Sequence, residues 1–245
     1  MKLFVDIGNT AIKWASEDDL RVHVSHRASS QGLPEGIDQA WARMPEPAEV
    51  HIASVRQRKV VESLTEWITR RWQATVRVSE TRDRELGVVN GYRIPSQLGV
   101  DRWLALLAAR AASSSPVVVV DCGSATTIDA VDGDGRHLGG FILPGLKLFM
   151  KCLHHNTDLP EETLGRELDS FATDTATGIQ SGAMLAHICM VEKALRSLEA
   201  REGDRANCIL TGGDAPLLTV HLKIAHQVVP DLVLQGLALQ SATAK

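Results

Sequence analysis

Two short stretches of the sequence share one pattern that suits phosphate chemistry. Residues 4–10 read Phe-Val-Asp-Ile-Gly-Asn-Thr and residues 119–125 read Val-Val-Asp-Cys-Gly-Ser-Ala. In each, an apolar strand runs into Asp-x-Gly, where glycine lets backbone N–H groups approach a ligand and hydroxyl or amide side chains follow. One copy alone is equally well an ordinary hairpin, because turns favour Asp and Gly. The repetition favours two related half-domains that grip a metal-bound nucleotide phosphate tail.

The first copy continues to a lysine that can take part in the same chemistry. The strand after the turn carries Lys13, which is expected to reach the phosphates that the turn amides bind. Asp6 would then hold Mg²⁺, directly or through water. Residues 6–13 are therefore interpreted as one phosphate motif.

A third motif combines opposite charges at the start of a predicted helix. Gly99-Val100-Asp101-Arg102 precedes residues 103–112, which have helical spacing. The positive end of the helix dipole favours an ionised Asp101 and an approaching anion, and Arg102 offers a fork of donors to a carboxylate. A helix cap with a surface ion pair explains the two residues equally well.

Two further segments are rich in glycine. Residues 139–145 read Gly-Gly-Phe-Ile-Leu-Pro-Gly, and residues 209–214 read Ile-Leu-Thr-Gly-Gly-Asp. A double glycine between a strand and a helix leaves bare backbone against which an adenine or ribose can lie, although a structural turn looks similar. The G-x-x-x-x-G-K-[ST] and G-x-G-x-x-G patterns do not occur, so P-loop and Rossmann sites lack their defining residues.

Hydrophobic spacing predicts a similar order of elements in each half of the chain. In the first half we expect strands at 2–7, 12–16, 21–26, 50–54 and 76–78, a short helix around Trp41 and an amphipathic helix at 60–72. In the second half we expect strands at 117–121, 126–131, 137–143 and 208–210, helices at 144–154, 175–198 and 230–240, and a loop at 158–174 near a site.

Three strands followed by alternating helix and strand is the order of a ribonuclease H-like half-domain, the unit of actin-like ATPases. The polar break at Ser113–Pro116 suits a boundary between such units. We therefore predict an α/β protein with two ribonuclease H-like (actin-like ATPase) half-domains, residues 1–115 and 116–245, that face an interdomain cleft.

Composition excludes several other classes of protein. The 245 residues carry a net charge of -4 without a dense Lys/Arg block, which argues against a nucleic-acid or anionic-membrane surface. The 4 cysteines form no C-x-x-C pair, which argues against a zinc site or a disulfide framework and fits a reducing cytoplasm. No apolar stretch has the length of a transmembrane helix, so a cytoplasmic protein without a membrane partner is expected.

The ordered motifs resemble those of the type III pantothenate kinases, also known as the Bvg accessory factor family. The shared patterns are D-x-G-N-T-x-x-K, G-x-D-R, D-x-G-[ST]-A-T-T, G-G-x-I-x-P-G and T-G-G-x-A, over nearly the whole chain. The resemblance implies the fold of acetate and sugar kinases, heat-shock ATPases and actin, and a homodimer. It implies ATP-dependent phosphorylation of pantothenate to 4'-phosphopantothenate, the first step toward coenzyme A, with Mg²⁺ and a monovalent cation such as potassium or ammonium.

The resemblance also assigns roles by position. Asp101 would be the catalytic base and Arg102 would hold the substrate carboxylate, while Asp6 would organise Mg²⁺ and Asp121 would bind the monovalent cation. The residues implied in ATP binding are Asp6, Ile7, Gly8, Asn9, Thr10, Ala11, Ile12, Lys13 and Ser124. Those implied in pantothenate binding are Tyr92, Gly99, Val100, Asp101, Arg102 and Thr175.

The sequence departs from the family's pattern at three positions. Ser124 replaces the commoner Thr and keeps the hydroxyl, Asp174 replaces Asn, and Gly178 replaces Ala. The last two lie beside Thr175. Within the chain, Ile128 stands as far after Asp121 as Lys13 stands after Asp6, so the second turn is expected to lack the lysine.

Two rival functions stay open. A kinase of the same fold that acts on a sugar or another small alcohol would share the phosphate turns, although Gly99–Arg102 is a poor match to sugar-binding loops. A nucleotide-binding accessory factor that modulates transcription without turnover would also share the fold, although the retained Lys13, Asp101 and Asp121 argue against an inactive kinase.

Overall fold

The computed structural model describes residues 1–160 and 168–243 of the chain. It contains two compact units. Unit 1 comprises Met1–Ala112 together with the C-terminal segment that begins at Asp231, and unit 2 comprises Ser113–Pro230.

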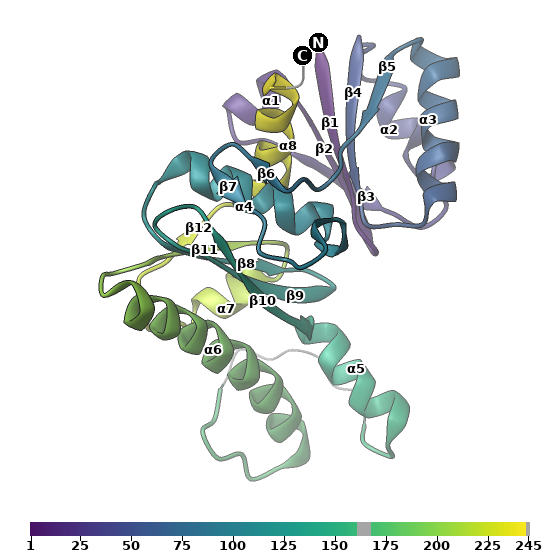
Figure 1. Ribbon diagram of the computed structural model, residues 1–245. Coiled ribbons are helices and arrows are strands. Elements are labelled where there is room, and N and C mark those ends of the chain that lie inside the picture. Colours follow the sequence, from purple (N-terminus) through teal and green to yellow (C-terminus); the bar gives the residue numbers. More distant parts are fainter. Residues whose placement is uncertain (161–167, 244–245) are drawn as a thin grey trace. The chain divides into compact units, whose positions relative to one another are not determined.

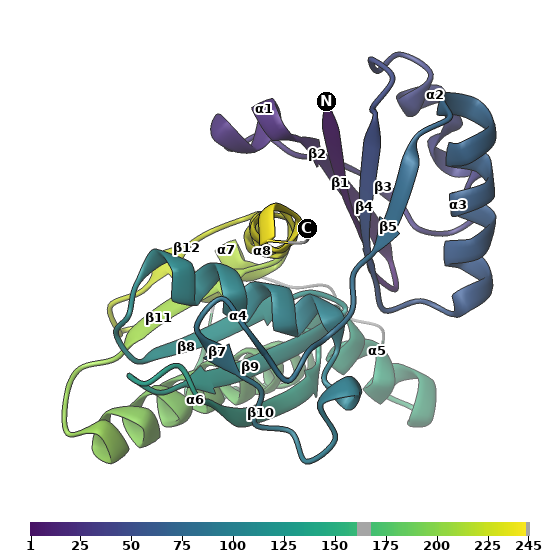
Figure 2. The ribbon, with the colours of Figure 1, turned by 45° about the horizontal axis from the view of Figure 1, so that its top comes forward.

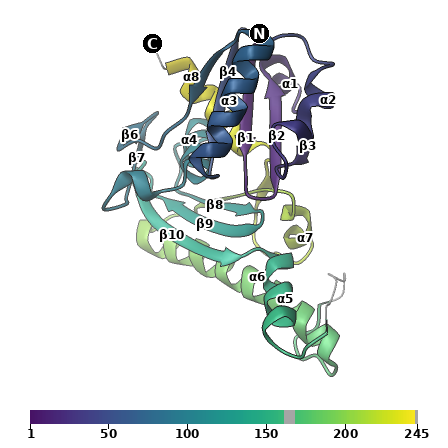
Figure 3. The same cartoon turned by 90° about the vertical axis from the view of Figure 1, so that its right-hand side faces the viewer.

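Unit 1 is built on a five-stranded sheet with the order β3-β2-β1-β4-β5. β1 runs antiparallel to β2 and parallel to β4, and β4 is parallel to β5. Figure 3 shows the β1–β2 hairpin with its turn at one end of this sheet. The strands are β1 (Lys2–Ile7), β2 (Ala11–Ser16), β3 (His26–Ser29), β4 (Glu49–Ser54) and β5 (Thr75–Val78).

One face of this sheet is covered by α3 (Arg58–Trp72) and the short α2 (Asp38–Trp41). The helical spacing predicted for 60–72 is confirmed, because Leu64, Ile68 and Trp72 are buried on the side that faces the sheet. Apolar residues of β1 and β2 meet them from the sheet, and Trp41 packs against Trp72 with ring centroids 5.2 Å apart. A row of apolar side chains at helical spacing thus fixes α3 on the strands.

The other helices of unit 1 are α4 (Val100–Ala112) and α8 (Leu232–Thr243), which pack against each other. A Cβ on Gly236 would lie 2.0 Å from the carbonyl oxygen of Leu104, so glycine permits this close approach. The boundary predicted from the sequence placed residues 231–245 with the second half. The structure instead packs α8 on unit 1, where its apolar residues are buried.

The prediction for residues 21–26 is wrong. The chain forms α1 (Glu17–Arg21), residues 22–25 form neither helix nor strand, and β3 begins only at His26. The reason is a capping box, in which Ser16 Oγ accepts from the Asp19 N–H at 3.1 Å and Asp19 Oδ2 accepts from the Ser16 N–H at 2.9 Å. These local hydrogen bonds begin a helix just before the segment that was predicted as a strand.

Unit 2 repeats the sheet of unit 1, with the order β10-β9-β8-β11-β12 and the same strand directions. The apolar run at Val117–Val120 is buried, as predicted for a central strand. Helix α6 packs against β8 and β9. The elements are β8 (Val117–Cys122), β9 (Ala125–Val131), β10 (His137–Pro144), α5 (Leu146–Asn156), α6 (Thr175–Glu202), β11 (Asn207–Thr211), α7 (Ala215–Thr219) and β12 (Gln227–Val228).

The remaining elements are small. Unit 1 also contains the hairpin of β6 (Arg84–Glu85) and β7 (Val88–Val89) and the 3-10 helices η1 (Glu35–Ile37) and η2 (Pro95–Gln97). Part of the loop expected at 158–174, residues 161–167, lies outside the described residues. None of the helices in the described ranges is long and apolar enough to cross a membrane.

Candidate active site

The β1–β2 turn holds the first predicted phosphate motif. The Gly8 N–H donates to the Ala11 carbonyl at 2.9 Å and closes the turn. In the antiparallel register Asp6 lies directly opposite Lys13, so both side chains project from one face of the sheet. The structure therefore places the predicted metal-binding residue and the predicted phosphate-binding residue at facing positions of one hairpin.

The residues beside them have two different environments. Ile7 and Ile12, also predicted in ATP binding, are fully buried in the core on the opposite face, so only their backbone can contact a ligand. Asn9 and Thr10 are exposed at the tip of the turn. The turn is thus anchored from below by apolar side chains and presents its polar end outward.

Two residues that sequence reasoning missed hold the tip of this turn. Ser30 follows β3 and Arg56 follows β4. Ser30 Oγ donates to the Asn9 carbonyl at 2.9 Å, and Arg56 Nη1 donates to the same oxygen at 2.8 Å. The sheet topology could have indicated Arg56. The carboxyl ends of parallel strands such as β1 and β4 meet at one edge of a sheet, so residues that follow β4 lie near the turn that follows β1.

The predicted substrate residues meet at the start of α4. Asp101 lies in the first turn of the helix, and its Oδ1 accepts from the Arg102 N–H at 2.7 Å. Arg102 is 6% exposed; its Nη1 donates to the Tyr92 hydroxyl at 2.8 Å, and its guanidinium carbon lies 5.5 Å from the centroid of the Tyr92 ring. The structure therefore joins Tyr92 to Arg102, although the two residues come from different segments.

Gly99 lies tightly against this pair. A Cβ on Gly99 would be 2.6 Å from Asp101 Oδ1, so a side chain there would displace the carboxylate. Arg102 keeps its charge at any physiological pH and presents a fixed fork of donors. The start of α4 thus combines a carboxylate with a largely buried guanidinium whose orientation is set by a tyrosine.

The second turn, between β8 and β9, is one residue shorter than the first. The Gly123 N–H donates to the Ala125 carbonyl at 3.1 Å, and Asp121 lies opposite Thr127 in the strand register. The expectation that Ile128 occupies the place of Lys13 is wrong, because counting residues ignored this difference in turn length. Ile128 is 1% exposed and belongs to the core of unit 2.

Glycines from two other segments approach the second turn closely. The Gly145 N–H donates to the Ser124 carbonyl at 3.0 Å, and a Cβ on Gly145 would lie 2.1 Å from the Gly123 carbonyl oxygen. Gly212 has a φ of +92°, and a Cβ there would lie 2.5 Å from Asp121 Oδ1. The glycine-rich segments predicted at 139–145 and 209–214 therefore converge on the turn that carries Asp121.

Two charged residues near this turn were not predicted. Lys147 Nζ lies 3.0 Å from Asp214 Oδ1, and the Asp214 N–H donates to the Cys122 carbonyl at 3.0 Å. Burial, with the nearby carboxylates of Asp121 and Asp214, raises the pKa of the Cys122 thiol far above its usual range. Cys122 is therefore a protonated packing residue and not a nucleophile.

Two further predicted residues lie at exposed positions of unit 2. Ser124 is exposed in the β8–β9 turn, and Thr175 is exposed as the first residue of α6. Asp174 caps this helix: its carboxylate accepts from the Thr177 N–H at 2.9 Å, which lowers the pKa of Asp174. Asp174 thus serves as the N-cap of α6.

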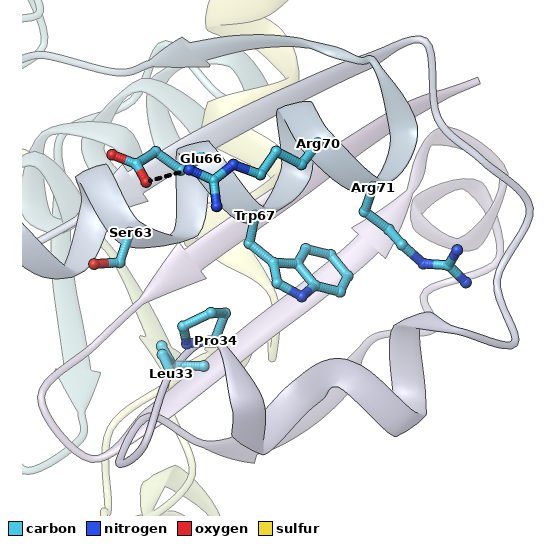
Figure 4. Close-up of a pocket in the computed structure, with 7 residues that line it drawn as sticks. All are labelled: Leu33, Pro34, Ser63, Glu66, Trp67, Arg70 and Arg71. Carbon is cyan, nitrogen blue, oxygen red and sulfur yellow. Dashed lines mark hydrogen bonds and ion pairs between the residues drawn. The ribbon is translucent and has the colours of Figure 1, made fainter.

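Two cavities of unit 1 do not involve any predicted site residue. Figure 4 shows the larger one, of about 570 Å³, in which Trp67 points into the space between α3 and Leu33–Pro34 while Arg70 turns toward Glu66. The smaller, of about 340 Å³, lies beside His51 and Gln240. Over residues 1–160 and 168–243 no group of three His, Cys, Asp or Glu side chains is arranged to hold a metal ion.

Two units with the same sheet order, each with an Asp-x-Gly turn after its first strand, define the class of proteins with the actin-like fold. Solved structures of this class are similar in fold. A Campylobacter jejuni protein described as a Baf family transcriptional activator superimposes with a TM-score of 0.67 and 20% identity, covering 98% of each chain. A Sinorhizobium meliloti protein described as a 2-dehydro-3-deoxygalactonokinase has a TM-score of 0.59 and 15% identity, covering 100% of each chain.

Sequence comparison identifies the family within this class. The family profile of type III pantothenate kinase matches residues 2–197. The type III pantothenate kinase of Nitrosococcus oceani is 33% identical over 246 residues, which cover 97% of this chain and 92% of that protein. The enzyme of Burkholderia cenocepacia (strain J2315) is 34% identical over 253 residues, which cover 99% and 95%. The chain belongs to the type III pantothenate kinase family, and the prediction of family and fold is confirmed.

Proposed function

We propose that this chain transfers the γ-phosphoryl group of ATP to the primary alcohol of pantothenate, giving 4'-phosphopantothenate, the first step toward coenzyme A. One observation of the structure carries most weight beside the family membership. Asp101 and the largely buried Arg102 stand together at the start of α4, and Tyr92 holds the guanidinium. A general base and a carboxylate receptor side by side suit a substrate that has a hydroxyl and a carboxylate.

The β1–β2 turn supplies the phosphate site of this proposal. Lys13 and the backbone N–H groups of the turn would neutralise charge on the transferred phosphoryl group. Asp6 is a single carboxylate, which fits Mg²⁺, because this ion commonly takes one or two carboxylates and completes its shell with phosphate oxygens and water. When bound, the ion would supply further neutralisation of the phosphates.

The turn that carries Asp121 fits a weakly hydrated monovalent cation. Asp121 Oδ1 and the Cys122 carbonyl oxygen both border the space that a Cβ on residue 212 would fill. Carboxylate and carbonyl oxygens around a bare glycine are the donor set that potassium takes, and ammonium can donate hydrogen bonds to the same atoms. Ser124, exposed in the same turn, would contact the phosphates of ATP.

Asp101 has a modest chemical task in this reaction. Phosphoryl transfer passes through a loose transition state, so positioning and charge neutralisation dominate. Asp101 would orient the pantothenate hydroxyl and accept its proton late in the transfer. Arg102 would hold the pantothenate carboxylate in a bidentate contact, with Tyr92 fixing the plane of the guanidinium.

The assay that tests the function uses the purified chain with Mg-ATP and pantothenate, in potassium and in a salt without potassium or ammonium. Phosphopantothenate in the potassium arm is the expected product. Absence of product in both arms would contradict the proposal. Phosphorylation of a sugar in place of pantothenate would support the sugar-kinase alternative. Nucleotide binding without any turnover would support the accessory-factor alternative.

The role of Asp101 is tested by the substitution Asp101→Asn, which keeps the size of the side chain and removes its basicity. Turnover is expected to fall by at least about a hundredfold, the scale of general-base loss, while ATP binding stays unchanged. Near-normal turnover in this variant would exclude Asp101 from the chemistry.

Other parts of the proposal follow from the family alone. A homodimer, a cytoplasmic location, and a contact between Thr175 and the substrate stay predictions. The double glycine at Gly212-Gly213 is where we expect the adenosine to lie. Gel filtration with light scattering tests the dimer, and a Thr175→Ala variant with a raised KM for pantothenate alone would support that contact.

A further inference from the structure

We propose that Arg56, together with Ser30, is a positioning residue for nucleotide binding: the two side chains fix the Asn9 peptide group so that the turn presents its N–H groups to the phosphates. This inference rests on the proposed function of the β1–β2 turn as the phosphate site. It assigns a task to two residues that lie outside the motifs of the family resemblance.

The two residues reach the turn from opposite sides of the hairpin. Ser30 follows β3, which pairs with β2, and Arg56 follows β4, which pairs with β1. Both donate to the carbonyl oxygen of Asn9, at 2.9 and 2.8 Å. The Ser30 N–H also donates to the Thr10 carbonyl at 3.1 Å. The exposed tip of the turn is therefore held by three hydrogen bonds from two flanking segments.

This arrangement sets the direction of a backbone donor. In a planar trans peptide the carbonyl and the N–H point in opposite directions, so the Asn9 carbonyl and the Thr10 N–H are oriented as one rigid unit. With the carbonyl held by Ser30 and Arg56, the orientation of this peptide group at the tip of the turn is fixed. A turn that presents N–H groups in a fixed direction is the kind of backbone site that binds phosphate.

Charge strengthens the same effect. The guanidinium of Arg56 is permanently ionised, and its hydrogen bond to the Asn9 carbonyl polarises that peptide group. Arg56 also places a positive charge beside the turn, on the β4 side, whereas Lys13 reaches it from β2. Ser30 is 1% exposed, so its contact is shielded from water.

The chain offers a matched control two residues further on. Arg58 is also an arginine at the start of α3, but its side chain is 91% exposed and its Nε donates to Glu62 at 2.7 Å. Arg58→Ala removes the same charge from the same region without touching the turn. A comparison of Arg56→Ala with Arg58→Ala therefore separates the contact from a general loss of positive charge.

The experiment measures binding of Mg-ADP by calorimetry, KM for ATP and for pantothenate, and the thermal midpoint in the wild type and both variants. We expect Arg56→Ala to weaken nucleotide binding and raise KM for ATP by about tenfold, the scale of one hydrogen bond from a charged donor. KM for pantothenate is expected to stay within about twofold, and Arg58→Ala to match the wild type.

Three further variants test the shared carbonyl. Ser30→Ala is expected to raise KM for ATP by about threefold. Because Ser30 and Arg56 act on the same oxygen, the double variant is expected to deviate from the product of the two single effects. Arg56→Lys keeps a charged donor and is expected to recover part of the loss.

The outcomes separate this inference from the proposed function. A wild type that binds no nucleotide would overturn the proposed function and this inference with it. A wild type that binds nucleotide while Arg56→Ala binds equally well would overturn the inference alone. A loss of the same size in Arg58→Ala, or a lowered thermal midpoint with unchanged KM for ATP, would also overturn it.

Discussion

The two units use one strand-turn-strand design and make two different turns from it. In unit 1 the turn closes from Gly8 to Ala11 and places Lys13 opposite Asp6, whereas in unit 2 it closes from Gly123 to Ala125 and places Thr127 opposite Asp121. One residue of turn length, and not the aspartate, therefore decides which side chain faces the carboxylate.

The surroundings of the two turns differ as well. The first is exposed at its tip and held from the side by Ser30 and Arg56, while the second is approached closely by the bare backbone of Gly145 and Gly212. An open turn with two cations nearby suits a phosphate chain that enters and leaves. A turn enclosed by backbone and a carboxylate suits a weakly hydrated monovalent cation.

The largest expected effect concerns Lys13, the charged residue that has no counterpart in the second turn. Lys13→Ala removes the ammonium that would neutralise negative charge on the transferred phosphoryl group. Turnover is therefore expected to fall by about a thousandfold. Thr127→Ala, at the same register position of unit 2, is expected to lower turnover less than about tenfold. Steady-state kinetics with pantothenate measure turnover in both variants. Equal losses of turnover would mean that both turns neutralise the transferred phosphoryl group equally.

The next effect concerns how tightly the two turns are enclosed. Gly145→Ala would place a Cβ 2.1 Å from the Gly123 carbonyl oxygen, whereas Gly8→Ala would place one 3.1 Å from the Ala11 carbonyl oxygen. Denaturant unfolding is expected to show a loss of about 3 kcal/mol for the first variant and about 1 kcal/mol for the second. Equal stability of the two variants would contradict the description of the second turn as the more enclosed.

The smallest effect is a pH dependence in unit 1. His51 on β4 is 5% exposed, and burial lowers its pKa although Glu49 opposes the shift. Because the folded state disfavours the charged ring, the stability linked to His51 is present above the unfolded pKa of about 6.5 and is lost as the pH falls through the lowered folded value. The free energy of unfolding is therefore expected to fall as the pH is lowered. Measured between about pH 7.5 and 5, the free energy of unfolding should depend less on pH in His51→Gln than in the wild type. An unchanged pH dependence would exclude His51 as its source.

The sequence predicted those parts of the fold that depend on local patterns. Alternation and apolar runs located β1, β4 and β8, and helical spacing located α3, because both signals are contained in a few neighbouring residues. The helix at residues 17–21 was missed, although the capping box between Ser16 and Asp19 that begins it is a local feature. The place of α8 on unit 1 was missed because it depends on Gly236 meeting Leu104, a contact between distant segments.

In the candidate site, too, the features that depend on neighbouring residues were predictable and the contacts between distant segments were not. The pairing of Asp6 with Lys13 follows from one hairpin, and the adjacency of Asp101 and Arg102 is contained in the sequence itself. Ser30 and Arg56 reach Asn9 from two other strands, so nothing in the motif indicates them. The comparison with Ile128 failed because the length of a turn is set by its hydrogen bonds, which residue counting does not reveal.

We assign a monovalent cation to the second turn and Mg-ATP to the first. The most direct measurement is turnover as potassium is titrated at constant ionic strength and saturating Mg-ATP, in the wild type, in Asp121→Asn and in Asp6→Asn. We predict that potassium activates the wild type, that Asp121→Asn loses this response, and that Asp6→Asn keeps it while its requirement for Mg²⁺ rises. Unchanged activation by potassium in Asp121→Asn would contradict the claim.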